Sequence, residues 1–150
     1  MSQTQPLDLA AMSGLDQLMA MRDGLLPPAP IAETLGMVNF DGELGSISVE
    51  LDPAVRHYNP LGTVHGGVIS TLLDTAAGCA VHSTLAAGEL YTSLDLTVKF
   101  LRPVTVDSGR LRAEGSVVQR GRRTALAQAQ LFDADERLVA HATSTCMIFT

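Results

Sequence analysis

The sequence predicts an α+β fold in which a curved antiparallel sheet wraps around one long central helix, with a short helix near the N-terminus. Three observations lead to this prediction. Residues 67–85 form a long run of small and apolar residues without proline. Segments with apolar residues at alternate positions lie before and after that run. The chain also lacks the strand–helix–strand alternation that is typical of a parallel sheet.

The N-terminal part of the chain is expected to contribute one short helix. Residues 12–22 place Leu15, Leu18 and Met19 near helical spacing, and the helix should end near Gly24. The Pro-rich stretch 26–30 then interrupts regular structure and is interpreted as an extended tether. Because these residues are too few to form a core of their own, we divide the chain into an N-terminal helix and tether, residues 1–30, and a main domain, residues 31–150.

The first two strands are expected to form a hairpin. Residues 37–40 and 46–51 have strand character, and Asp41-Gly42-Glu43 is a turn sequence. After the central helix, apolar residues alternate with polar ones over 91–101, which predicts a strand with Leu94 and Phe100 on its buried face. Further strands are expected over 109–119, 123–132 and 137–149. Such long strands favour a sheet that curls around the one buried helix.

The central helix contains a single charged residue. Asp74 is the only ionisable residue between Gly66 and Val81, and the helix is expected to be enclosed on nearly every side because it lacks a polar face. A buried carboxylate without a partner is costly, and no cation lies one helical turn away. We interpret Asp74 as a nucleophile or general base; a structural Asp bound by Ser, Thr or backbone donors is the alternative.

The amino end of the same helix carries the sequence His65-Gly66-Gly67. The two glycines allow a ligand to approach the backbone closely, and the free N–H groups of a first helical turn suit a developing oxyanion. Gly66 and Asp74 are eight residues apart, or about 12 Å along a helix. One carbonyl group cannot contact both in a single helix, so the spacing predicts a homodimer in which two antiparallel helices form two composite sites.

The composition narrows the range of partners. With 150 residues, 46% of them hydrophobic, the chain suffices for one folded domain, and a net charge of −6 disfavours nucleic acid and anionic membranes. The N-terminus lacks the pattern of a signal peptide, and we expect a soluble cytoplasmic protein. Cys79 and Cys146 lie in no disulfide framework, and no His or Cys spacing predicts a metal site.

One short segment concentrates positive charge. Arg120, Gly121, Arg122, Arg123 and Thr124 follow one another, so three guanidinium groups lie within four positions around a glycine turn. Guanidinium groups bind phosphate through several hydrogen bonds at once. The segment is a candidate phosphate site, with an ordinary solvated turn as the alternative.

The motif Asn59-Pro-Leu-Gly-Thr-Val-His-Gly-Gly, with Asp74 nine residues after the His, resembles the PaaI-type hotdog-fold acyl-CoA thioesterases. These are similar to the class of 4-hydroxybenzoyl-CoA thioesterase whose catalytic carboxylate lies on the central helix. The resemblance spans about residues 31–149. It implies a hotdog fold, which agrees with the arrangement predicted above, and an assembly of two dimers into a homotetramer.

The resemblance also implies a role for each motif residue. Asp74 becomes the catalytic carboxylate, the Gly66 N–H polarises the thioester carbonyl with help from Asn59, and His65 orders the turn. Ser93 matches a hydroxyl that some relatives place near the attacking water. This chain departs from some relatives by having Gly78, and not Thr, one helical turn after the acid.

For CoA, the resemblance implies contacts with Gly67 and with the basic turn, made by Arg120, Arg122, Arg123 and Thr124. The expected reaction is hydrolysis of an acyl-CoA to the free acid and CoA, with CoA as part of the substrate and no separate cofactor. Whether Asp74 attacks the carbonyl or activates water stays open, as does the acyl group. The alternatives are a hotdog hydratase or dehydratase with His65 as base, and a noncatalytic acyl-CoA binding module.

Overall fold

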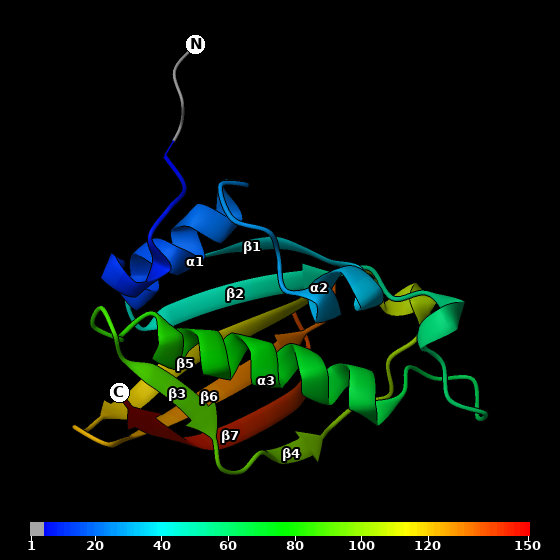
Figure 1. The fold of residues 1–150 in the computed structure, drawn as a ribbon. Helices are drawn as coiled ribbons and strands as arrows, with labels where there is room; N and C mark the ends of the chain where they lie inside the picture. Colours follow the sequence, from blue (N-terminus) through cyan, green and yellow to red (C-terminus); the bar gives the residue numbers. More distant parts are fainter. Residues whose placement is uncertain (1–4) are drawn as a thin grey trace.

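Helix α3, Gly66–His82, lies across the concave face of a curved antiparallel sheet (Figure 1). The computed structural model describes residues 5–150. The sheet has seven strands in the order β1-β2-β5-β6-β7-β3, and β4 also pairs with β7. The strands are β1 Met37–Glu43, β2 Ser46–Leu51, β3 Leu90–Ser93, β4 Thr97–Phe100, β5 Leu111–Arg120, β6 Thr124–Phe132 and β7 Leu138–Phe149. The predicted hotdog arrangement is confirmed.

Small residues allow α3 to lie close to the sheet. Leu72, Leu73 and Ala76 of α3 are completely buried. On β5, a β-carbon added to Gly115 would lie 2.0 Å from the carbonyl oxygen of Ala76, so only glycine fits at this crossing. The inner face of the sheet is rich in buried alanines for the same reason; these are Ala113, Ala125, Ala127, Ala129, Ala140 and Ala142.

The N-terminal segment lies over β1 and the carboxyl-terminal end of α3 (Figure 1). Helix α1, Gly14–Arg22, begins where the Ser13 hydroxyl accepts a hydrogen bond from the Asp16 N–H, as expected for a helix in this region. The tether is shorter than predicted, because Pro30 starts a second helix, α2, Pro30–Leu35. Proline suits this first helical position since its missing N–H would have no partner there. Short 3₁₀ turns cover Leu9–Ala11, Val55–His57 and Val106–Ser108.

The predicted position of the first hairpin turn is wrong. Strand β1 continues through Asp41-Gly42-Glu43, and the hairpin turns at Leu44-Gly45. Gly42 is required inside the strand, since a β-carbon there would lie 2.3 Å from the carbonyl oxygen of Ser46. An Asp-Gly pair is a strong turn signal, and here the close approach of the partner strand accounts for the glycine.

The predicted strand over 91–101 is divided into β3 and β4. Between them, the Asp95 carboxylate accepts a hydrogen bond from the Thr145 N–H at 2.7 Å, in place of a backbone partner. The prediction that Leu94 and Phe100 are buried is wrong, because they are 57% and 56% exposed. Strand β3 lies at the end of the sheet, so this apolar surface has no covering within one chain.

Helix α3 is not enclosed on every side, contrary to the prediction. Gly67 and Asp74 are exposed, while Ser70, Thr71 and Thr75 are half-buried. The sheet of one chain reaches around only part of the helix, and the polar and small residues of α3 lie on the side that it leaves open. No helix within residues 5–150 is long and apolar enough to cross a bilayer.

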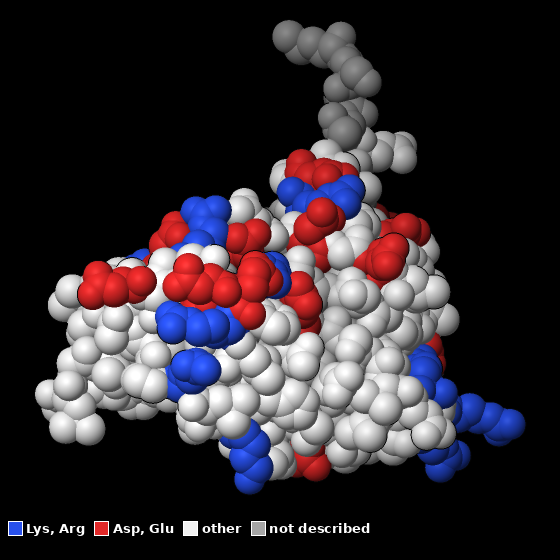
Figure 2. Space-filling view, turned by 180° about the vertical axis from the view of Figure 1, so that it is seen from behind, with Lys and Arg blue, Asp and Glu red and all other residues white. Residues whose placement is uncertain are grey.

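The outer face of the sheet divides into a charged and an uncharged part (Figure 2). Ion pairs such as Arg110–Asp52 at 2.7 Å and Arg112–Glu136 at 2.7 Å belong to the charged part. Apolar side chains are also exposed on β5, β6 and β7; they are Val118, Leu126, Met147 and Phe149.

Candidate active site

The amino end of α3 presents one free backbone donor. His65 is the N-cap of the helix, and its Nδ1 accepts a hydrogen bond from the Gly67 N–H at 2.8 Å. The Gly66 N–H has no acceptor among residues 5–150. The Gly67 amide is therefore occupied, and the Gly66 amide is the one open to a ligand. The Nδ1 contact matches the turn-ordering role that the resemblance implies for His65.

Asn59 and Gly66 line the same cleft, which has a volume of about 300 Å³. The Asn59 Oδ1 accepts hydrogen bonds from the N–H groups of Leu61 and Thr63, and its Nδ2 donates one to the Thr63 hydroxyl at 2.9 Å. One Nδ2–H has no acceptor in the described part of the chain. The structure thus brings together the two residues that the sequence analysis selects as carbonyl ligands.

The same cleft includes two residues that the sequence analysis missed. Phe100 lies directly over Gly66, since a β-carbon on Gly66 would be 3.1 Å from the ring. Arg102 also lines the cleft and is exposed. No sequence signal distinguishes these residues from ordinary strand positions, because they reach the cleft only through the pairing of β4 with β7.

Asp74 and Ser93 form a second polar centre, on the open side of α3. The Ser93 Oγ lies 3.5 Å from the Asp74 Oδ1 and 3.8 Å from the Cys146 Sγ. Both Asp74 and Ser93 are exposed, and Asp74 has no ion pair in residues 5–150. The predicted burial of Asp74 is wrong for a single chain. The carboxylate is free to act on a group that approaches from outside the protomer.

Tyr91 provides a second hydroxyl near Asp74, which the sequence analysis missed. Its oxygen would lie 3.0 Å from a β-carbon at Gly78, one helical turn after Asp74. Burial, together with the nearby Cys79, Cys146 and Asp74, raises the pKa of Tyr91, so the hydroxyl stays protonated at neutral pH. Gly78 therefore has a packing role: a larger residue there would displace the ring.

The two centres lie apart on one chain. Gly66 and Asp74 are separated by two turns of α3, as the sequence spacing predicts. An amide donor at a helix amino end stabilises negative charge on an oxygen, and an exposed carboxylate provides a base or nucleophile. These are the groups that hydrolysis of an activated carbonyl requires.

The basic turn between β5 and β6 is only partly available. The Arg120 side chain donates hydrogen bonds to the Thr84 hydroxyl, the Gly121 carbonyl and the Glu89 carboxylate. In this structure the Arg120 guanidinium joins the turn to the segment that follows α3, and its expected contact with phosphate stays a prediction. Arg122, Arg123 and Thr124 are exposed. Neither of these two arginines has an ion pair within the described chain.

No three His, Cys, Asp or Glu side chains gather into a possible metal site in residues 5–150. The His82 side chain, on the last turn of α3, is instead bound to Gln17 of α1 at 2.7 Å. Burial lowers the pKa of His82, which favours its neutral form.

Comparisons with known proteins identify the family of the chain. The model of the Thioesterase superfamily matches residues 61–140. The medium/long-chain acyl-CoA thioesterase YigI of Escherichia coli K12 is 29% identical over 134 residues, which are 79% of this chain and 85% of that protein.

Two solved structures share the fold. A phenylacetic acid degradation-related protein of Ralstonia eutropha JMP134 is 33% identical, with a TM-score of 0.78 over 87% of this chain and 98% of that one. The PaaI protein of E. coli is 21% identical, with a TM-score of 0.79 over 95% and 97% of the two chains. The chain thus belongs to the Thioesterase superfamily, as a thioester hydrolase of the PaaI-type hotdog fold that the motif around His65 and Asp74 predicts.

Proposed function

We propose that the protein hydrolyses acyl-CoA thioesters to a carboxylic acid and CoA, in composite sites formed by two copies of the chain. One observation carries this proposal. On the open side of α3, the Gly66 N–H at the amino end is free, and the Asp74 carboxylate near the middle of the helix is exposed. The name of the E. coli relative supports acyl-CoA as the substrate class.

The chemistry follows from these two groups. The thioester carbonyl oxygen accepts hydrogen bonds from the Gly66 N–H and the Asn59 amide, which stabilise the oxyanion as it forms. The partner's Asp74 takes a proton from water, whose oxygen bonds to the carbonyl carbon. Collapse of the intermediate breaks the C–S bond, and the CoA thiolate leaves and is protonated. In the alternative route, the Asp74 carboxylate attacks the carbonyl carbon and the C–S bond breaks, which expels the CoA thiolate. Water then cleaves the resulting anhydride to the free acid and the Asp74 carboxylate.

Several features support a dimer with antiparallel helices. Strand β3 has an unpaired edge, and the exposed apolar side chains near it are Leu90, Leu94, Phe100 and Leu101. An unpaired strand edge beside exposed apolar side chains favours pairing with another chain. A second copy on this side would also cover the open side of α3 and bring its Asp74 to the Gly66 cleft.

The wider assembly and the CoA contacts belong to the same proposal. The apolar side chains on the outer face of β5, β6 and β7 suit contact between two dimers, which would give a homotetramer.

Arg122 and Arg123 are the free cations of the basic turn and are assigned to the CoA phosphates, with Thr124 and Gly67 nearby in the bound complex.

A substrate panel tests the proposed function. Purified protein is mixed with aliphatic and aromatic acyl-CoAs, and free CoA is measured with a thiol reagent. We expect release of CoA from wild type, and binding without turnover in Asp74→Asn. Binding without CoA release by wild type across the whole panel would contradict the proposal. A change in an enoyl chromophore without free thiol would indicate a hydratase.

A further inference from the structure

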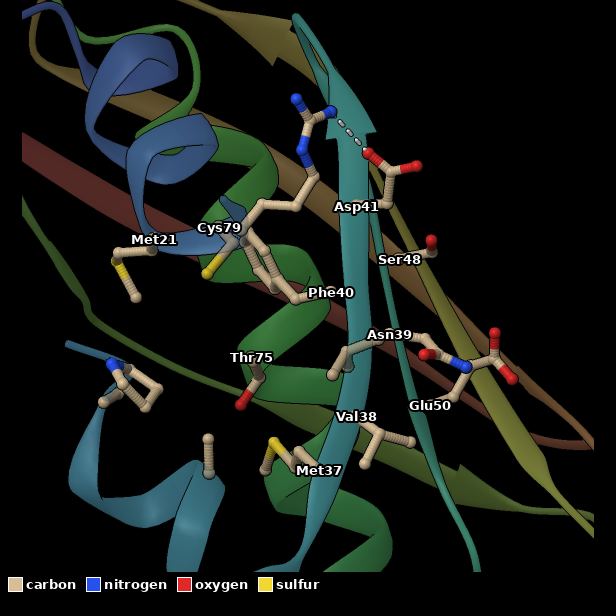
Figure 3. A pocket seen from close by; sticks show the side chains of 15 residues that line it. Met21, Met37, Val38, Asn39, Phe40, Asp41, Ser48, Glu50, Thr75 and Cys79 are labelled. Atoms are coloured by element: carbon tan, nitrogen blue, oxygen red, sulfur yellow. Dashed lines mark hydrogen bonds and ion pairs between the residues drawn. The ribbon is translucent and has the colours of Figure 1, made fainter. Parts of the chain in front are cut away.

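A larger cavity adjoins the Asp74 side of α3. It has a volume of about 660 Å³ and lies between the N-terminal segment, strand β1 and α3 (Figure 3). Met21, Pro28 and Ala32 form the wall from the N-terminal segment, while Met37 and Phe40 line it from β1. Residues that precede the sheet therefore border the cavity on one side.

The cavity lies next to the proposed reaction centre on α3. Thr75, which follows Asp74 in sequence, lines it, and so does Cys79 on the next turn of the same helix side. Burial, and to a lesser extent the charge of Asp74, raises the pKa of the Cys79 thiol to about 12, so this part of the wall is uncharged at neutral pH. A group attached to a carbonyl beside Asp74 can thus extend directly into this space.

Apolar side chains, two methionines among them, form much of the wall. In Figure 3, the side chains of Met21, Met37 and Cys79 lie on one side of β1, and those of Asp41 and Glu50 lie on the other. Methionine side chains adapt their shape to ligands of variable form. Phe40 is the one aromatic residue among those that line the cavity.

The charged groups at the cavity rim are paired. Arg22 contacts Asp41 at 2.9 Å and also Asp23 at 2.9 Å. Glu50 lies 3.9 Å from Arg110. Among residues 5–150, no unpaired cation lines the cavity to receive a second carboxylate at the far end of an acyl group. This distribution favours an uncharged chain.

We propose that this cavity binds the acyl group of the substrate as a straight, uncharged aliphatic chain, and that the N-terminal segment forms the wall that limits chain length. The inference rests on the proposed function. Residues 13–32 then contribute to substrate selection in addition to covering β1 and the end of α3.

Two substitutions on α2 test the proposal as a matched pair. Ala32 is half-buried and lines the cavity, whereas its neighbour Ile31 is 48% exposed and does not. Ala32→Phe is expected to lower kcat/KM for dodecanoyl-CoA at least about tenfold while butanoyl-CoA stays within about twofold of wild type, since even one methylene group changes pocket selectivity by this order. Ile31→Phe should keep the wild-type chain-length profile.

A second pair covers the case in which Ala32→Phe does not fold. Met21→Ala enlarges the cavity and should shift the preferred acyl chain to a greater length. Met19→Ala removes the same side chain from a half-buried position of α1 outside the cavity and should leave the preference unchanged. Folding of each variant is checked by its thermal midpoint.

The outcomes separate the two proposals. If wild type releases no CoA from any acyl-CoA, the proposed function fails. If wild type is active but the folded cavity variants keep the chain-length profile of their controls, the acyl-chain assignment is overturned while the proposed function stands.

Discussion

The Ser93 hydroxyl lies 3.5 Å from the Asp74 carboxylate, so the edge strand β3 and the open side of α3 meet at one polar point. Asp74 has no cationic partner among residues 5–150, and within those residues its side chain makes a polar contact with this hydroxyl. A carboxylate in this setting is accessible and weakly held. These properties suit a base or nucleophile that acts on a substrate supplied from outside the protomer.

Asp74→Asn is expected to lower kcat by about 10²- to 10⁴-fold, the usual contribution of a positioned acid or base, with little change in acyl-CoA affinity. Initial rates of CoA release and equilibrium binding measure the two effects. Asp107→Asn, at an exposed position away from α3, is the matched control and should keep wild-type activity. Equal activity of the two variants would remove Asp74 from the mechanism.

The Gly66 amide can be removed without removing the helix. Gly66 is the first residue of α3, a position that tolerates proline, and the preceding His65 has an extended ψ of 134° that proline also requires. Gly66→Pro is expected to lower kcat by about 10²- to 10³-fold, as loss of an oxyanion donor does. Gly66→Ala adds the same β-carbon beside Phe100 but keeps the N–H, so it should retain most of the activity. An equal loss in both variants would indicate crowding as the cause.

Substitutions at Arg122 and Arg123 of the basic turn are expected to weaken binding of the CoA part of the substrate and nothing else. Arg122→Gln with Arg123→Gln is expected to raise KM for an acyl-CoA about tenfold, the effect of one lost charge-assisted hydrogen bond. The KM for the corresponding acyl-N-acetylcysteamine thioester, which lacks the nucleotide, should not change. A similar rise with both substrates would show that the turn does not contact the nucleotide part. Arg120→Gln should instead lower stability, because Arg120 binds Thr84 and Glu89.

A pH-dependent contribution to stability is expected at the β6–β7 turn. The side chain of Asp133 is buried, which raises its pKa, but hydrogen bonds from Arg137 and from the Asp135 N–H outweigh burial, so the pKa lies below its ordinary value. A carboxyl group whose pKa is lower in the folded than in the unfolded state stabilises the fold at pH values above its unfolded-state pKa of about 3.9. This stabilisation is lost as the pH falls through the lower folded-state pKa.

Asp133→Asn keeps an acceptor oxygen but removes the charge. It should lower the free energy of unfolding by about 1–2 kcal/mol at pH 7. The difference from wild type should shrink below about pH 4, because the wild-type carboxylate then becomes protonated. Urea denaturation at several pH values measures this difference in the free energy of unfolding. A difference that stays constant from neutral to acidic pH would contradict the charge-based explanation.

The sequence predicted the parts of the fold that depend on local periodicity. Helix α3 and strands β5, β6 and β7 have boundaries within three residues of those expected, because long runs with period 3.6 or 2 carry strong signals. The separation of Gly66 from Asp74 was also predictable, since it follows from helical rise alone.

Features that depend on distant contacts were not predictable. The Asp-Gly pair at Gly42 was misread as a turn because the close crossing at Ser46 is a tertiary contact. The exposure of Asp74 depends on how far the sheet reaches around α3, which composition does not determine. Tyr91 was missed for the same reason, since its position over Gly78 arises from the pairing of β3 with β7.

Mixing two inactive variants tests the composite site most directly. Asp74→Asn and Gly66→Pro are each purified, combined, dissociated and reassembled. A mixed dimer then holds one site with both groups intact, and random assembly predicts return of roughly a quarter of wild-type CoA release. Activity that stays at the level of the separate variants, with mixed dimers present, would contradict the account, because it would place the amide and the carboxylate of each site on one chain.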